Sequence, residues 1–390
     1  MKTRLEELDS LRGFAAIFVV FLHMYLMVPG DKFLKIIFEY SPFRLFTSGG
    51  ESVVLFFVLS GFVLSLPYFN NKQSSYFSFV VKRICRIYLP YLFTVIVAII
   101  CRELFYSGQL KGYSEWFNTI WISSISMEVI EDHVILIGTF LSNLDPVVWS
   151  LLHEMRISII FPVLMILIVR LNWKQGLALS LLFSLIGMII YQLSKPTNTG
   201  TELVATINYI AMFVIGALLA KYRMTIANKF SLLTKKSKVI LFVIGLIIYL
   251  FLHPSFGIKL FLYPEISPFY RTVIDSWAVT GGGVILIIFA LNSSLFSRLL
   301  RNYLINYLGK ISYSLYLIHV VVLFSAVHRL HNILPLWCIF LLTLIISLII
   351  SVGMYHLIER PSIQLGKALT KRIFRRSKPQ FNNEFEKRFN

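Results

Sequence analysis

The sequence predicts an all-α fold, a polytopic membrane helix bundle of about ten transmembrane helices with both termini in the cytoplasm. Three observations lead to this prediction. Hydrophobic residues make up 57% of the 390 positions, and the mean hydropathy is +0.75, which is more apolar surface than a soluble domain can bury. The apolar residues gather in ten long runs, and the positive charges gather in alternate loops between them.

The ten apolar runs are each close to the roughly 20 residues that a helix needs to cross a bilayer. No small-residue cleavage site follows the first run, so we expect a retained helix rather than a signal peptide. We expect one membrane domain over residues 1–365 and a short basic cytoplasmic tail over 366–390. The expected spans are 11–28, 50–68, 87–106, 147–169, 175–193, 203–220, 237–253, 277–293, 310–327 and 335–357.

The distribution of positive charge orients the bundle. With ten spans, 27 of the 37 lysines and arginines lie on the side of both termini and eight on the opposite side, while Arg102 and Arg156 fall inside spans. Cytoplasmic loops of membrane proteins carry such an excess, so both termini are predicted to be cytoplasmic. The net charge of +18 is thereby explained without a nucleic-acid partner. The basic tail is expected to meet anionic membrane lipids or to be solvated.

The three cysteines, Cys85, Cys101 and Cys338, are scattered along the chain. Cys85 is expected to face the reducing cytoplasm, and the other two lie in or beside spans. We therefore predict neither a disulfide framework nor a metal cluster, and no permanently bound cofactor.

Arg12 and His23 lie in the first run, eleven residues apart. At about 100° per residue the two side chains share one helix face, and the rise between them is about 16 Å. A helix that starts near Arg12 would place the arginine at the membrane surface and the histidine near mid-bilayer. An ionisable group at that depth is a functional candidate. The alternative is a neutral histidine that hydrogen-bonds a neighbouring helix.

Arg83 and Arg86 lie three residues apart in KRICRIYLPY, where the third span begins. If this stretch is helical they are neighbours on one face. They are either a positive-inside anchor or a phosphate clamp, since the guanidinium fork pairs with phosphate oxygens. Arg12 is expected at the same cytoplasmic level, so that three guanidinium groups would converge on one polyphosphate ligand.

The fourth span contains His153, Glu154 and Arg156 within its apolar run. A carboxylate and an arginine inside a membrane need partners. Residues two apart on a helix point in different directions, so each should find its partner on another helix. His23 is one candidate partner for Glu154, and simple structural pairing is the alternative.

Other spans carry weaker signs of a site. The ninth has a polar stripe of Ser312, Tyr316 and His319, typical either of hydrogen bonds between helices or of substrate contacts. Ser60 and Trp149 are further candidates for acceptor or channel contacts. Trp116 and Trp121, in the long outer segment, are expected to be interface anchors or a platform for a sugar ring. We expect Pro361 to stop the tenth helix.

Taken in order, these segments resemble the acyltransferase family 3 membrane proteins. The matching motifs span nearly the whole chain, and the ordered set is specific although each motif alone is weak. Residues after WSLLHE differ from the commoner aromatic-rich sequence, which leaves Arg156 without a secure family role. The motifs are LRGFAAIFVVFLH, LFFVLSGF, RICRIYLPY, WSLLHE, ISYSLYLIH and the terminal IERP.

The resemblance implies an enzyme that moves an acyl group, often acetyl, from cytoplasmic acyl-coenzyme A to a hydroxyl of a cell-surface or secreted carbohydrate or lipid-linked glycan. It implies His23 as the catalytic residue, and Arg12, Arg83 and Arg86 as groups that bind the donor. Glu154 is expected to assist His23 or contact the acceptor. It also implies a multi-pass protein of the bacterial cytoplasmic membrane. We expect no attached esterase-like domain of the kind some relatives carry.

Two points stay open at this level. His23 would act either as a general base or as an acceptor of the acyl group itself. The alternative functions are a transporter of a polysaccharide precursor or other polar solute, and a sensor of lipid phosphates. Transporters often show paired halves and broken helices, and neither is evident in the sequence.

Overall fold

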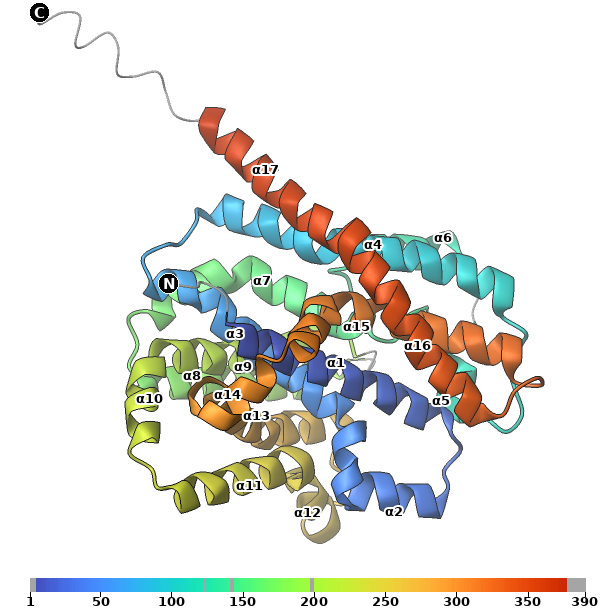
Figure 1. Cartoon of the computed structure of the whole chain (residues 1–390), viewed down its shortest axis with the longest axis horizontal. Coiled ribbons are helices and arrows are strands. Elements are labelled where there is room, and N and C mark those ends of the chain that lie inside the picture. Colours follow the sequence, from blue (N-terminus) through green and yellow to red (C-terminus); the bar gives the residue numbers. More distant parts are fainter. Residues whose placement is uncertain (1–4, 123, 141–143, 197–199, 377–390) are drawn as a thin grey trace, which may run out of the picture.

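The computed structural model describes residues 5–122, 124–140, 144–196 and 200–376, and within these ranges the chain forms helices and loops but no strand (Figure 1). The elements are α1 (Glu6–Met27), α2 (Lys32–Tyr40), the 3₁₀ helix η1 (Pro42–Thr47), α3 (Gly49–Phe69), α4 (Tyr76–Phe105), α5 (Glu115–Thr119), α6 (Met127–Ile135), α7 (Val148–Ile168), α8 (Trp173–Ser194), α9 (Leu203–Lys221), α10 (Arg223–Ser231), α11 (Lys235–Phe251), α12 (Pro254–Phe261), α13 (Pro268–Asn292), α14 (Ser294–Leu300), α15 (Tyr303–Leu330), α16 (Leu336–Met354), the π-turn η2 (Tyr355–Glu359) and α17 (Arg360–Arg376).

The predicted all-α membrane bundle is confirmed. Among the described residues, nine helical segments are long and apolar enough to cross a membrane, and the bent pair α11 and α12 makes a tenth when it is counted as one span. The bend of 53° lies at His253, whose ring is 3.3 Å from Glu51 and 3.6 Å from Asp275. The expected span 237–253 ends directly before Pro254, so the continuation of the chain as the bent helix α12 is a new observation.

Several helices begin well before the apolar runs that predict them. α4 starts at Tyr76, where the hydroxyl of Ser75 accepts a hydrogen bond from the amide of Ser78, rather than near residue 87. α15 starts at Tyr303, capped by Asn302, rather than near residue 310. Hydropathy marks the stretch that suits lipid, whereas capping side chains mark the end of the helix. Arg83 and Arg86 therefore lie inside a helix.

The expectation that Pro361 stops the last helix is wrong. Proline lacks an N–H and its ring crowds the carbonyl one turn earlier. The chain absorbs this with the π-turn η2 directly before it, and the helix then continues as α17, which packs against α4. Residues 366–376 of the expected tail are therefore helical, and residues 377–390 lie outside the described ranges. In Figure 1 α17 extends beyond the bundle.

Close glycine contacts bring the central helices together. A Cβ atom on Gly61 of α3 would lie 2.1 Å from the carbonyl oxygen of Phe213 in α9. A Cβ atom on Gly309 of α15 would lie 2.2 Å from the carbonyl oxygen of Asp9 in α1, beside Gly13. Small residues permit such close backbone approach between membrane helices. The crossing of α1 with α15 sets the relative height of every later residue on these two helices.

Candidate functional site

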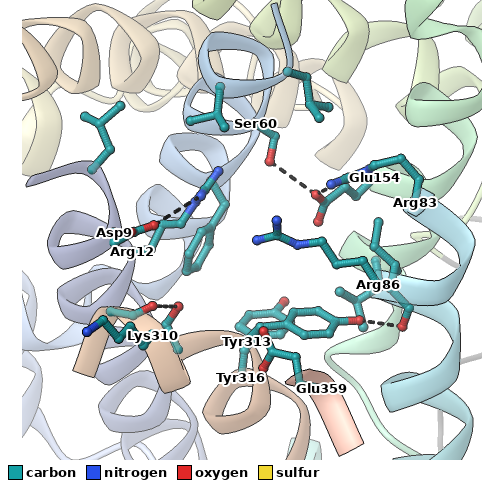
Figure 2. A pocket seen from close by; sticks show the side chains of 18 of the residues that line it. Asp9, Arg12, Ser60, Arg83, Arg86, Glu154, Lys310, Tyr313, Tyr316 and Glu359 are labelled. Atoms are coloured by element: carbon teal, nitrogen blue, oxygen red, sulfur yellow. Dashed lines mark hydrogen bonds and ion pairs between the residues drawn. The ribbon is translucent and has the colours of Figure 1, made fainter. Parts of the chain in front are cut away.

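A cavity of about 410 Å³ opens among α1, α3, α4, α7, α15, η2 and the start of α17 (Figure 2). Its polar wall carries more positive than negative charge. The cations are Arg12, Arg83, Arg86, Lys310 and Lys367, and the carboxylates are Asp9, Glu154 and Glu359.

The three arginines that the sequence selects all line this one cavity. Arg12 comes from α1, and Arg83 and Arg86 come from one face of α4, one turn apart. Figure 2 shows Arg86 reaching into the middle of the cavity, with Arg12 and Glu154 on opposite walls. From the sequence, Lys310 and Lys367 are expected only to contribute to the positive charge that orients the chain, because nothing in their local pattern separates a cavity cation from a membrane anchor.

Arg83 is already paired. Its guanidinium donates hydrogen bonds to Glu154 at 2.6 Å and to the hydroxyl of Ser158 at 3.0 Å. Arg12 lies 3.9 Å from Asp9, a longer ion pair, and Arg86 is exposed to the cavity. The three arginines thus differ: Arg83 fixes a carboxylate in the wall, while Arg12 and Arg86 face the open volume.

Glu154 has a different partner from the one considered in the sequence. In place of His23, its carboxylate accepts hydrogen bonds from Arg83 and, at 3.2 Å, from the hydroxyl of Ser60. A buried carboxylate is best stabilised by an arginine and a second donor. The close packing of α3, α4 and α7 supplies both here.

His23 lies beyond the cavity wall and meets a second histidine. Its Nδ1 atom is 3.0 Å from the carbonyl oxygen of Val19 and 3.0 Å from Nε2 of His319. Its ring stacks on Trp116 with centroids 5.5 Å apart. Along α1, His23 is about 16 Å from Arg12 but only about 6 Å from the helix end at Met27, nearer to that end than expected.

Tyr316 stands between the cavity and the histidines. It lines the cavity, its hydroxyl lies 2.6 Å from that of Ser150, and its ring centroid lies 6.1 Å from that of His319. Ser60 also lines the cavity. Trp149 instead packs against His153 and Tyr209, with ring centroids 6.0 Å apart in each pair.

His153 and Arg156 belong to a separate network. The two ring nitrogens of His153 lie 2.7 Å from the hydroxyl of Thr206 and 2.9 Å from the carbonyl oxygen of Gly200. Arg156 donates to the carbonyl oxygens of Ile137, Gly138 and Thr201. These contacts fasten two loops to the beginning of α7, which gives Arg156 the structural role that the sequence left undecided.

Comparison with known proteins agrees with this architecture. Neither the curated proteins nor the solved structures contain a match to the chain. A protein-family model, described as an acyltransferase domain, matches residues 5–356. That match takes in the three arginines of the cavity, the histidine pair and every long apolar helix through α16, so the chain belongs to the acyltransferase family 3 membrane enzymes.

Proposed function

We propose that the protein transfers an acyl group, acetyl in the simplest case, from cytoplasmic acyl-coenzyme A to a hydroxyl of a cell-surface or secreted carbohydrate. The observation that carries the proposal is the arrangement along α1. A cation-lined cavity surrounds Arg12, and a histidine pair lies about 16 Å further along the same helix. The protein would work in the cytoplasmic membrane of a bacterium.

The cavity suits the phosphate-bearing end of the donor. Five cationic side chains against three carboxylates leave an excess of positive charge where a polyphosphate would bind. Arg12 and Arg86 face the open volume, and guanidinium groups bind phosphate oxygens through charge-assisted hydrogen bonds. Glu154 holds Arg83 in the wall, so we propose that it shapes the donor site rather than touching the imidazole.

The thioester end of the donor would then reach toward His23. Coenzyme A carries its thioester on a long flexible arm, and the arm would pass Tyr316, whose hydroxyl is held by Ser150. In one route His23 takes the proton of the attacking hydroxyl, the new C–O bond forms, the C–S bond breaks, and the proton leaves with the thiolate. In the other route the imidazole first accepts the acyl group.

The acceptor would enter from the opposite side of the membrane. The excess of positive charge on the side of both termini supports a cytoplasmic position for the arginine cavity. His23 lies near the other end of α1 and stacks on Trp116, an aromatic residue of the kind on which sugar rings pack. Donor and acceptor would therefore approach the histidine from different sides.

Transport of a polar solute finds less support. The bent helix pair found among the described residues, α11 and α12, contributes no residue to the wall of the arginine cavity. A transporter built on a broken helix would place its ion and substrate site at that break. The bend at His253 instead contacts Glu51 and Asp275, which join it to α3 and α13.

Sealed vesicles of known orientation test the proposal. Radiolabelled acetyl-coenzyme A is supplied only on the side of the termini, and oligosaccharides from the cell envelope are confined to the other side. Labelled oligosaccharide is expected with the native protein and not with the His23→Gln variant. Oligosaccharide that crosses without gaining label would instead identify a transporter. Product that forms only when both substrates share one compartment would contradict the two-sided reaction.

A further inference from the structure

The two histidines beyond the cavity wall form a directional hydrogen-bond chain. His319 is fully buried, with 0% of its surface exposed. Its Nδ1 atom lies 3.0 Å from the carbonyl oxygen of Leu315, and its Nε2 atom lies 3.0 Å from Nδ1 of His23. The same Nδ1 atom of His23 lies 3.0 Å from the carbonyl oxygen of Val19.

These contacts determine which nitrogens carry hydrogen. A carbonyl oxygen can only accept, so Nδ1 of His319 must be the donor to Leu315. In the neutral ring its Nε2 is then a lone pair, which faces Nδ1 of His23. Nδ1 of His23 must therefore carry the proton, shared between Val19 and His319. Nε2 of His23 is left as the unprotonated nitrogen.

From this chain we propose that His319 is a positioning residue for the acyl transfer. It holds His23 in the tautomer with a free Nε2 and accepts a strengthened hydrogen bond from the imidazolium once Nε2 has taken a proton. The tautomer of His23 does not depend on the proposed function. The strengthened hydrogen bond during the reaction does rest on the proposed function. In catalytic triads a carboxylate orients the histidine that acts as the base. Here the imidazole ring of His319 would have that orienting role.

The balance of protons is simple. The acceptor hydroxyl gives its proton to Nε2 of His23 as the C–O bond forms, which makes the ring an imidazolium with two N–H groups. The Nδ1–H group then donates a charge-assisted bond to Nε2 of His319. When the C–S bond breaks, the proton on Nε2 passes to the departing thiolate, and both rings return to their starting forms.

The helix crossing explains why the two rings meet. His23 lies ten residues after Gly13, and His319 lies ten residues after Gly309. Gly13 lies against Gly309, and His23 lies against His319. Because both contacts join α1 to α15 at the same spacing, the two helices run in the same direction. Ten residues give the same rise of about 15 Å on each helix. The glycine crossing thus sets the register of the histidine pair.

The first test is spectroscopic and needs no substrate. The full-length protein is prepared with ¹⁵N-labelled histidine, and the His23 signals are assigned by their loss in the His23→Gln variant. We expect His23 to be protonated at Nδ1, with a coupling across the hydrogen bond to Nε2 of His319. A His23 ring protonated at Nε2, or no such coupling, would overturn the proposal even if the protein proves to be an active transferase.

The second test is kinetic and compares three variants, using acetyl-coenzyme A with envelope oligosaccharides. His319→Leu removes the acceptor for Nδ1–H, and kcat should fall at least 100-fold while KM for acetyl-coenzyme A stays within about twofold. His319→Gln places a carbonyl oxygen near Nδ1 and should recover at least a tenth of the native kcat. His331→Leu, at the residue that directly follows α15, is the matched control and should resemble the native protein.

Two kinetic outcomes would contradict the positioning role. The first is a native kcat for His319→Leu, because the hydrogen bond would then be dispensable. The second is an equal loss in the Leu and Gln variants, because His319 would then act through its shape alone. If the native protein transfers no acyl group at all, the proposed function fails, and the spectroscopic test still decides the tautomer.

Discussion

The arginine cavity and the histidine pair share α1 but differ in nearly every physical respect. The cavity is open, charged and lined by side chains from six α-helices and η2, and Arg86 is exposed to it. The histidine pair lies outside that wall, and His319 is wholly buried. Tyr316 lies at the boundary between the two regions.

This difference separates binding from chemistry along one helix. Positive charges in an open polar cavity attract an anion, and the open volume allows the anion to bind in several orientations. A buried hydrogen-bond chain instead orients one reacting atom. Substitutions in the cavity should therefore act on donor affinity. Substitutions at the histidines should act on turnover.

The largest effect is expected for His23→Gln. The amide keeps much of the shape of the ring but supplies no base, and general-base catalysis is worth about 10²–10⁴-fold. Transfer should fall by that amount, while the affinity for acetyl-coenzyme A, measured by equilibrium binding, stays close to native. A loss of donor affinity as large as the loss of turnover would show that the two regions are one site.

The next effect distinguishes Arg83 from Arg86. Arg86→Ala should raise KM for acetyl-coenzyme A by about 10–100-fold, because a charge-assisted bond to an anion is worth about 1.5–3 kcal/mol. Arg83→Ala should instead destabilise the protein by about 1–3 kcal/mol, because it leaves the partly buried Glu154 without its cation. Thermal unfolding and KM measured on the same samples separate the two outcomes.

The double variant Arg83→Ala with Glu154→Gln supplies the control. It removes both charges of the buried pair and should regain much of the stability lost in Arg83→Ala, since no unpaired carboxylate remains. Arg86→Lys should recover donor affinity only in part, because the guanidinium fork is lost. If Arg83→Ala raised KM and left the unfolding temperature unchanged, Arg83 would belong to the phosphate clamp and not to the wall.

Much of the fold could be predicted from the sequence, because span length is fixed by the thickness of the bilayer. Helix ends could not, because they depend on caps such as Ser75 and Asn302, which lie outside the apolar runs. The continuation past Pro361 was also beyond reach. The π-helical turn η2 relieves the clash between the ring of Pro361 and the preceding turn, and no local sequence pattern predicts such a turn.

The candidate site was partly predictable for a similar reason. Helix geometry alone gives the shared face and the separation of Arg12 and His23. The partners of Glu154 and His23 depend on which helices touch, and close backbone contacts such as that between Gly13 and Gly309 decide this. One sign was present in the sequence: each of these glycines precedes a histidine by ten residues.

The third effect tests that register. A Cβ atom on Gly309 would lie 2.2 Å from a backbone oxygen of α1, so Gly309→Ala must push α15 away from α1. Overpacking of this kind costs about 1–3 kcal/mol, and the shift should also reduce kcat by moving His319 relative to His23. Gly281→Ala, in α13 with open space around the new methyl group, is the matched control. If the Gly309→Ala protein were less stable but kept the native kcat, the crossing of α1 with α15 would not determine the geometry of the histidine pair.

The fourth effect concerns Asp145, a buried carboxyl group just before α7. It is near the boundary of the two regions, because Val147 accepts a hydrogen bond from Tyr316 at 3.3 Å. Burial raises the pKa of Asp145 from 3.8 to about 7. The folded protein therefore holds this proton more tightly than the unfolded chain does. Between about pH 4 and pH 7 stability should fall as the pH rises, and it should level off above that range.

Asp145→Asn removes this dependence, because the amide stays neutral and its oxygen can still accept the bond from the Val147 amide. The variant should match the native protein near pH 4 and exceed its stability at pH 8 by up to about 4 kcal/mol, from about 1.36 kcal/mol per pKa unit. Glu128→Gln, at an exposed position of α6, removes the same charge and should leave the pH profile unchanged. Thermal unfolding at pH 5 and pH 8 measures the difference. An unchanged slope in Asp145→Asn would mean that water reaches Asp145, and the contrast between a buried region around the histidines and an open cavity would no longer hold.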